Sequence, residues 1–307
     1  MILHRVSCHK NLIDRMIPPS KKHALVAMAK THAQTVRERS PAPHPAASMA
    51  RPSTPSSRAL SRAVVPRVAR PRAIAALVRA SAVSPAYDAV VRARVDALAA
   101  SIARAPGRQR FVAIAGPPGG GKSTLAEAVR DAYNARVGRD DACVVVPMDG
   151  FHYSLAYLDA QPDARELRRR RGAPWTFDAE AFVRCVRELR ANGRGDVPTF
   201  DHATHDPVPG GLRVERANEV VLVEGNYLLL PERPWADLVE EKAYDETWFV
   251  DTDVDEAMRR VTERHVRVGR TEAEARTRAE TNDGPNARLI VEKCRSLADV
   301  LIPSVRR

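Results

Sequence analysis

Short apolar runs separated by longer, mixed stretches mark the chain from residue 111 onward. Five runs have the length of buried strands: 111–115, 143–148, 220–223, 247–250 and 298–303. Continuously apolar runs are typical of a parallel sheet covered on both faces, because the polar alternation is lost when neither face meets water. The pattern predicts an α/β sandwich in which a mostly parallel sheet lies between layers of helices.

Helices are predicted between these runs by apolar residues that recur every three or four positions. In the first helix, residues four apart fall on one face: Leu125, Val129 and Tyr133. Gly138 is placed to end that helix. A second helix is predicted over 179–192 by the spacing of Phe182, Cys185, Val186 and Leu189. Asp178 is its expected N-cap and Gly193 its expected end.

The first apolar run leads directly into a glycine-rich loop, Gly116-Pro-Pro-Gly-Gly-Gly-Lys122-Ser123. This is the full G-x-x-x-x-G-K-[ST] pattern in the strand–loop–helix context of a phosphate-binding loop. Glycines let backbone N–H groups close around phosphates, and the helix N-terminus adds a partial positive charge. We expect Lys122 to reach the β- and γ-phosphates of ATP and the Ser123 hydroxyl to bind Mg²⁺. The loop residues predicted to contact ATP are Gly116, Gly119, Gly120, Gly121, Lys122, Ser123 and Thr124.

An acidic residue follows three of the predicted strands: Asp149, Glu224 and Asp251. Ligands bind beyond the carboxyl ends of the strands in an open parallel sheet, so these acids can gather near the nucleotide. Phosphoryl transfer to an alcohol needs a metal, a clamp of charge and a carboxylate that accepts the hydroxyl proton. Asp149 is predicted to be that base, and Glu224 to hold Mg²⁺ directly or through its neighbours. Asp251 is interpreted as structural, because an isolated acid after a strand more often caps a helix or loop.

The net charge of +11 for 307 residues is concentrated in an N-terminal extension. Residues 1–80 hold 15 of the 49 Lys and Arg residues and two of the 38 acids, which leaves 34 basic and 36 acidic residues and a net charge of −2 for the remainder. A nucleic-acid-binding protein needs its positive charge on a folded face, so no nucleic-acid partner is predicted. The sequence also has no apolar run long enough to span a bilayer.

Residues 1–80 have the composition of a disordered organelle presequence, since they are rich in Arg, Ala, Ser and Pro and poor in acids. A complete transit peptide is predicted to begin at Met49, with Val-Arg-Ala at 78–80 as the processing site. An ordinary disordered basic tail is the alternative. We expect import into the plastid (the chloroplast stroma), with the mitochondrial matrix as the alternative, and the organelle import machinery as a partner. Residues 81–307 are predicted to form one kinase domain.

Two motifs that each follow a predicted strand, Asp149-Gly-Phe-His152 and Glu224-Gly-Asn226, resemble those of the uridine kinase, pantothenate kinase and phosphoribulokinase superfamily. The resemblance runs from about residue 111 to the C-terminus and includes four further segments: 171–174, 176–178, 200–207 and 282–286. It looks strongest to a bacterial and fungal branch that includes fructose kinases. It implies a P-loop kinase fold that uses ATP and Mg²⁺, and in the family the acid matching Asp149 is the catalytic base.

About seventy residues separate Asp149 from the next predicted core strand, which is too long for a plain loop, so this insertion is predicted to build the acceptor site. Four residues are candidates for binding the acceptor: His152, Arg171, His202 and His205. The resemblance supports the last two, since pantothenate kinases have a His at the place of His202 and uridine kinases a Thr-His at 204–205. Few aromatic residues accompany them, which favours a sugar or polyol, with pantothenate and a nucleoside as alternatives.

An arginine-rich stretch follows the fourth strand, with cations at spacings of four and three that predict one helical face: Arg260, Arg264, Arg267 and Arg270. A solvated helix is the plain interpretation, but the resemblance implies a lid that closes over ATP. Arginine suits this role because its planar fork binds phosphate oxygens and keeps its charge. Arg264 and Arg270 are predicted to be catalytic, and Gly269 to let the lid turn. Asn282 and Asn286 are expected near the nucleotide base.

Together these features predict an ATP-dependent kinase that phosphorylates a hydroxyl group on a small metabolite. A nucleotide-binding regulator without turnover is the alternative from another class. Asp149 counts against it, because a switch ATPase has no need of a base on the acceptor side. A homodimer is left open by the sequence.

Overall fold

The structure, a computed structural model, describes residues 84–304. The predicted presequence, 1–80, and its expected start at Met49 lie outside these residues. Within 84–304, no helix is long and apolar enough to cross a membrane.

A five-stranded sheet forms the centre, in the order β2-β5-β1-β6-β7. Its strands have the bounds β1 Arg110–Ala115, β2 Cys143–Pro147, β5 Val220–Glu224, β6 Glu246–Asp251 and β7 Val300–Pro303. All neighbouring strands are parallel, which confirms the predicted sheet. In the register, Glu224 lies opposite both Ile114 and Pro147. The carboxyl ends of β1, β2 and β5 therefore meet at one edge of the sheet, where the predicted acids follow.

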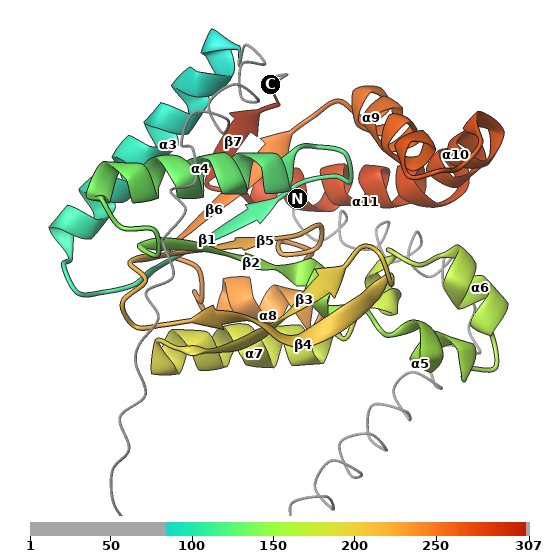
Figure 1. The fold of residues 1–307 in the computed structure, drawn as a ribbon, viewed down its shortest axis with the longest axis horizontal. Helices are drawn as coiled ribbons and strands as arrows, with labels where there is room; N and C mark the ends of the chain where they lie inside the picture. Colours follow the sequence, from blue (N-terminus) through green and yellow to red (C-terminus); the bar gives the residue numbers. More distant parts are fainter. Residues whose placement is uncertain (1–83, 305–307) are drawn as a thin grey trace, which may run out of the picture. The chain divides into compact units, whose positions relative to one another are not determined.

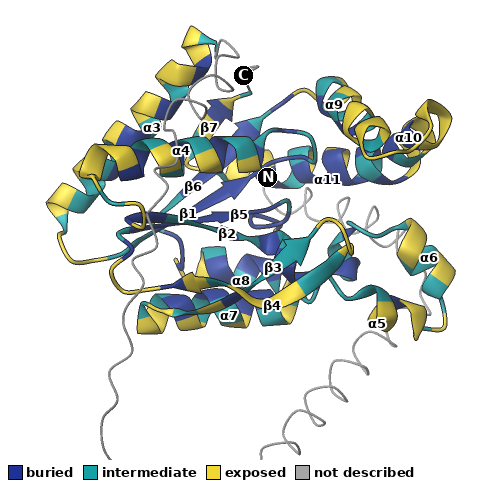
Figure 2. Cartoon of the chain, viewed as in Figure 1, coloured by how far each residue is buried: buried dark blue, intermediate teal, exposed yellow. Residues whose placement is uncertain are grey.

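Helices cover both faces of the sheet and complete the three predicted layers (Figure 1). On one face lie α3, Pro85–Arg104, and α4, Lys122–Val137. On the other lie α7, Ala179–Asn192, and α8, Trp235–Glu240. A hydrophobic core cluster packs the apolar face of α4 against buried strand residues that include Val112, Leu222 and Trp248. Figure 2 shows the central strands buried between these layers.

Helix α3 belongs to this core but was not predicted as an element. Its buried residues, spaced by four, four and three, are Tyr87, Val91, Val95 and Leu98. The Tyr87 hydroxyl donates a hydrogen bond to the Thr124 carbonyl at 3.0 Å, which ties α3 to the first turn of α4. The folded domain therefore includes residues just beyond the predicted processing site.

The insertion after β2 contains short helices, α7 and a β-hairpin. Its elements are η1 Met148–Phe151, α5 Leu155–Asp159, α6 Ala164–Arg169, η2 Pro174–Thr176, α7, β3 Gly195–Asp201 and β4 Asp206–Val214. Strands β3 and β4 pair antiparallel in a sheet of their own. A Cβ on Gly150 would lie 2.0 Å from the Pro198 carbonyl oxygen, so the hairpin presses directly on the turn that carries Asp149. The insertion is thus folded onto the end of β2.

The predicted arginine-rich helix is α9, Val254–Arg267. It is followed by α10 Glu272–Arg278, η3 Ala279–Asp283, α11 Gly284–Cys294 and η4 Arg295–Leu297. Gly269 has a φ of +99° and stands in open space just after α9. Because the left-handed conformation ends the helix, Arg270 lies in the α9–α10 connection, and the prediction that it shares the helical face of Arg264 was wrong.

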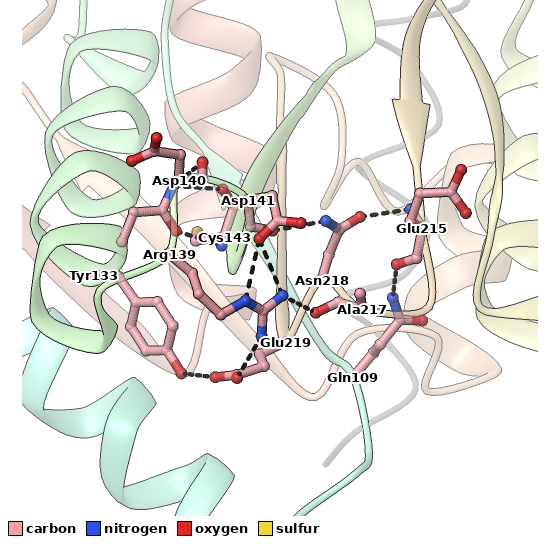
Figure 3. Close-up of polar contacts among 11 residues, drawn as sticks. Gln109, Tyr133, Arg139, Asp140, Asp141, Cys143, Glu215, Ala217, Asn218 and Glu219 are labelled. Atoms are coloured by element: carbon pink, nitrogen blue, oxygen red, sulfur yellow. Dashed lines mark hydrogen bonds and ion pairs between the residues drawn. The ribbon is translucent and has the colours of Figure 1, made fainter.

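A polar network fastens the opposite, amino-terminal end of the sheet (Figure 3). Arg139 donates hydrogen bonds to Asp141, to the Ala217 carbonyl at 2.7 Å and to Glu219 at 3.1 Å. Asn218 Nδ2 donates to the Asp141 carbonyl at 2.7 Å. These contacts hold the connection between α4 and β2 against the connection that precedes β5. They therefore fix the register in which β2 and β5 begin to pair.

Candidate active site

The glycine-rich loop lies between β1 and α4 at the carboxyl edge of the sheet. Gly119 has a φ of +78°, and a Cβ there would lie 2.3 Å from the Ala257 carbonyl oxygen of α9 and 2.8 Å from Val261. Gly121, with a φ of +94°, is the N-cap of α4 and offers no side chain to its first N–H groups. Free N–H groups at a helix N-terminus are an anion-binding arrangement. The loop therefore fits the phosphates of a nucleotide.

A cavity of about 750 Å³ opens over this loop and brings together residues from distant parts of the chain. The sheet edge contributes Asp149, Glu224, Gly225 and Asn226. Helix α9 contributes Arg259, Arg260, Glu263, Arg264 and Arg267. The predicted loop residues Gly119 through Thr124 line the cavity, whereas Gly116 is buried at the base of the loop, against Val250.

Lys122 is 8% exposed, and its amino group points back across the loop. Its Nζ donates hydrogen bonds to the Pro117 carbonyl at 3.0 Å and to Asn226 Oδ1 at 2.7 Å. Burial lowers the pKa of Lys122, while Glu224 and Asp149 raise it and Arg264 lowers it. The lysine is thus held largely buried at the wall of the cavity, where a phosphate group would interact with it more strongly than in bulk water.

Glu224 is also 8% exposed, and burial raises its pKa to about 7. Lys122 and a hydrogen bond from Ser123 oppose this shift, while Asp149 adds to it. Among residues 84–304, no group of three His, Cys, Asp or Glu side chains is placed to hold a metal. Mg²⁺ in phosphoryl-transfer sites is usually bound by one or two carboxylates together with the phosphates themselves, so the pair of Ser123 and Glu224 fits it.

The third predicted group of the site, Asp149, lies half-buried in the same cavity, in the 3-10 turn at the end of β2. The Nδ1 atom of His152 lies 2.9 Å from the Asp149 carbonyl oxygen and 3.9 Å from its Oδ1. The His152 ring lies 3.9 Å from the Phe177 ring and 5.0 Å from the Phe200 ring, centroid to centroid. Burial lowers the pKa of His152. His152 is therefore a neutral, fixed support of the turn that carries Asp149.

The other acceptor candidates lie elsewhere. His202 and His205 are exposed on the turn between β3 and β4 and do not line the cavity. The Arg171 guanidinium donates to the His205 carbonyl at 2.6 Å and to the Tyr153 carbonyl at 2.9 Å, and lies 3.4 Å from Asp206 Oδ1. The structure gives Arg171 the role of a clasp within the insertion rather than of a free substrate ligand.

The arginines of α9 divide into fixed and free side chains. Arg260 donates to Glu256 and, at 2.8 Å, to the Ser304 hydroxyl, which lies 3.3 Å from the Gly120 carbonyl oxygen. Arg264 and Arg267 line the cavity and form no ion pair within the described part of the chain. Arg270 does not line it. Two unpaired cations therefore face the phosphate loop from the lid.

Asn282 and Asn286, which the sequence predicts near the nucleotide base, lie in η3 and α11. Both side chains are buried, at 1% and 2% exposed, and neither lines the cavity. Asn282 Nδ2 donates to the Arg171 carbonyl at 2.9 Å, which ties η3 to the insertion. The Oδ1 atoms of both residues are buried without a hydrogen-bond partner in the described structure.

Comparison with known proteins agrees with this geometry. A profile of the phosphoribulokinase / uridine kinase family matches residues 111–307. The chain belongs to this family. It is therefore an ATP-dependent kinase of the uridine kinase and phosphoribulokinase type, and the resemblance expected from its motifs is confirmed.

Relatives of this kinase occur in fungi and bacteria. A Schizosaccharomyces pombe protein named as a candidate uridine kinase is 40% identical over 200 residues, which cover 64% of this chain and 83% of that protein. An uncharacterised Escherichia coli protein is 33% identical over 191 residues, covering 62% of this chain and 76% of the other. The crystal structure of a candidate fructose transport system kinase from a Silicibacter species has a TM-score of 0.60 at 34% identity, over 68% of this chain and 98% of that one.

Two site residues of this kinase were not predicted from its sequence. Asn226 holds Lys122, and the motif Glu224-Gly-Asn226 already contained it without showing its partner. Tyr87 also lines the nucleotide cavity. The regular spacing of the apolar residues of α3 could have revealed that helix, and with it the position of Tyr87.

Proposed function

We propose that this kinase transfers the γ-phosphoryl group of ATP to a hydroxyl group of a small metabolite, a sugar or polyol. The observation that carries the proposal is the meeting of Lys122, Asp149 and Glu224 in one cavity over the phosphate loop. A nucleotide-binding regulator needs the lysine and the glutamate but has no use for Asp149, which lies at the end of the neighbouring strand.

Each group has a distinct task in the transfer. Asp149 accepts the proton of the acceptor hydroxyl. At the same time the hydroxyl oxygen of the acceptor forms the new bond to the γ-phosphorus, and the bond between that phosphorus and the ADP oxygen breaks. Lys122, with Arg264 and Arg267, stabilises negative charge on the phosphate oxygens. Ser123 and Glu224 would hold Mg²⁺, which supplies further neutralisation of the phosphate charge. The loop amides and the α4 N-terminus hold the nucleotide in place.

The apolar part of the cavity lining suits the nucleotide base. Tyr87 and Val90 of α3 form one wall, and Ile302 and Pro303 of β7 contribute to the lining as well. Apolar side chains of this kind favour a flat, uncharged ring over another charged group. We therefore propose that the base binds against α3, away from Asn282 and Asn286.

The acceptor is proposed to bind on the other side of Asp149, toward the insertion. A hydroxyl-rich acceptor is supported by the similarity to a candidate fructose transport system kinase. The Schizosaccharomyces relative keeps a nucleoside open as the alternative acceptor, and pantothenate is the second.

Replacing Asp149 by Asn tests the proposal, because the amide keeps the shape of the carboxylate but cannot accept the proton. Transfer to the acceptor should fall by roughly 10²–10⁴-fold, whereas ATP affinity should change little. Both are measured with residues 81–307, ADP release giving the rate and fluorescence titration giving the affinity. A variant that mainly weakens binding of ATP with Mg²⁺ would identify Asp149 as a metal ligand. Wild-type turnover in this variant would remove the case for a base.

A further inference from the structure

A second group of arginines lies outside the nucleotide cavity, where the insertion meets the lid. Its members are Arg170 and Arg171, which follow α6, and Arg278, the last residue of α10. Arg278 Nη2 donates to the Arg171 carbonyl at 3.1 Å. In return, Arg170 Nη1 lies 3.5 Å from the Thr281 carbonyl oxygen. The two segments thus reach across to each other and bring three guanidinium groups to one junction.

Of these three groups, Arg171 is already engaged by protein atoms. Its guanidinium bonds to two carbonyls and to Asp206, as described above. Arg278 differs, because no carboxylate within residues 84–304 forms an ion pair with it. The nearby acid, Asp283, pairs instead with His265 at 2.9 Å.

The surroundings of Arg278 leave its charge poorly compensated. Burial lowers the pKa of Arg278; Asp283 opposes this shift, and Arg270 and Arg264 add to it. Arg170 has unused hydrogen-bond donors, since its Nε and Nη2 atoms are buried without a hydrogen-bond partner in the described structure. Arg170 also stacks over the Trp175 ring at 5.4 Å, but within the described residues neither Arg170 nor Arg278 has a carboxylate ion pair. A partly desolvated cation without a counter-charge is costly, and a bound anion would relieve that cost.

Contacts connect this junction to the catalytic turn. Arg171 stacks over the Phe200 ring at 5.6 Å, and that ring lies 5.0 Å from the His152 ring, which supports the Asp149 backbone. On the other side, Arg264 influences the pKa of both Arg278 and Lys122. Through its bond to the Arg171 carbonyl, Arg278 lies against the insertion, where the acceptor is proposed to bind.

The nucleotide does not need this second group. The phosphates of a bound nucleotide would face Lys122, Arg264 and Arg267 within the cavity, and Arg278 is not part of its lining. We propose that Arg278, beside Arg170, binds an oxyanion carried by the acceptor, so that the substrate is an acidic hydroxy compound such as a sugar acid or a sugar phosphate. This inference rests on the proposed kinase function and narrows its acceptor class. Arginine recognises carboxylate and phosphate by the same planar fork.

The test compares acceptors in matched pairs that differ in charge. ADP release is measured with a hexonate and its hexitol, with a sugar phosphate and its parent sugar, and with pantothenate and its alcohol. The anionic member should be preferred, and the pair that responds distinguishes a carboxylate from a phosphate. Arg278→Gln should lower kcat/KM for the anionic acceptor by about 10–100-fold, the loss expected for one charge-assisted hydrogen bond. The KM for ATP should stay within about twofold.

Arg276→Gln is the matched control, since Arg276 lies on the same helix, is exposed and pairs with Glu272 at 2.9 Å. It should leave all constants within about twofold. Arg278→Lys should recover part of the loss, because it keeps a charged donor near the Arg171 carbonyl. Equal effects of Arg278→Gln on both members of a pair, or a rise in the KM for ATP as large as that for the acceptor, would overturn the inference.

A binding measurement separates this inference from the kinase proposal. Inorganic phosphate and acetate are titrated by calorimetry into residues 81–307 saturated with Mg²⁺ and a non-hydrolysable ATP analogue. Anion binding that Arg278→Gln weakens at least tenfold, and that Arg276→Gln leaves unchanged, supports the anion site. This holds even if no acceptor is phosphorylated, because a lack of turnover would count against the kinase proposal alone. Preference for neutral acceptors, or absence of anion binding, would refute the anion site and leave the kinase proposal standing.

Discussion

The raised pKa of Glu224 predicts how nucleotide binding depends on pH. With a pKa of about 7, roughly one tenth of the Glu224 carboxyl groups are ionised at pH 6 and roughly nine tenths at pH 8. Only the carboxylate can bind Mg²⁺. The affinity for ATP with Mg²⁺ should therefore rise about tenfold between these two pH values. A glutamate at its ordinary pKa of 4.5 would be ionised throughout and give almost no change.

The same carboxyl group affects stability in the opposite sense. Because its pKa is raised by folding, the folded protein holds the proton more tightly than the unfolded chain, and stability falls as the pH rises from about 4.5 to about 7. Thermal unfolding without nucleotide should therefore show a falling Tm across this window. Glu224→Gln should lack this contribution to the decline.

The assay is a titration with a fluorescent ATP analogue at constant free Mg²⁺ and ionic strength between pH 6 and pH 8. Phosphate groups of the nucleotide also titrate near pH 6, so Glu224→Gln serves as the control that isolates their contribution. It should bind more weakly and show only the dependence due to the nucleotide. A flat profile for the wild type, or an equally steep one for the variant, would refute the assignment of Glu224 to the metal site.

Three further predictions concern separate parts of the molecule. Lys122→Ala should reduce kcat at least about 10²-fold with an unchanged circular dichroism spectrum, and near-wild-type kcat would exclude its role at the phosphates. Tyr87→Ala should raise the KM for ATP about tenfold without changing the KM for the acceptor, and an unchanged KM for ATP would contradict the proposed base pocket. Tyr87→Phe is the control, because it removes only the hydrogen bond to Thr124. Removing residues 1–80 should preserve ATP affinity and Tm. It should also abolish import into the plastid, or into the mitochondrion in the alternative, as followed by microscopy. A cytosolic location of the full-length protein would contradict the targeting proposal.

The sheet and its catalytic edge could be predicted from the sequence because each depends on local patterns. Apolar runs gave the five strands of the sheet, and the acid after a run placed Asp149 and Glu224 at adjoining strand ends. The glycine motif needed no tertiary information, since its backbone conformation is set by Gly119 and Gly121. These are features in which the residue type itself carries the chemistry.

The roles of polar residues outside these patterns could not be predicted in the same way. Asn282 and Arg171 bond to carbonyl groups far away in the chain, and a buried amide of this kind looks like a ligand contact in the sequence. Arg270 continued the charge spacing of α9, but periodicity does not show where Gly269 ends the helix. Helix α3 escaped because many alanines dilute the contrast between its buried and exposed faces.

The tight seat of Gly119 against α9 has a mechanical consequence for the lid. The loop leaves no room for a methyl group beside Ala257 and Val261, and Arg260 is fastened through Ser304 to Gly120. We therefore expect the first half of α9 to act as a fixed fulcrum that moves with the phosphate loop. Any opening movement of the lid must therefore bend α9 beyond Val261, and it would move Arg264 and Arg267 together. Because both side chains line the cavity in the described structure, such a movement would withdraw them from the phosphate loop.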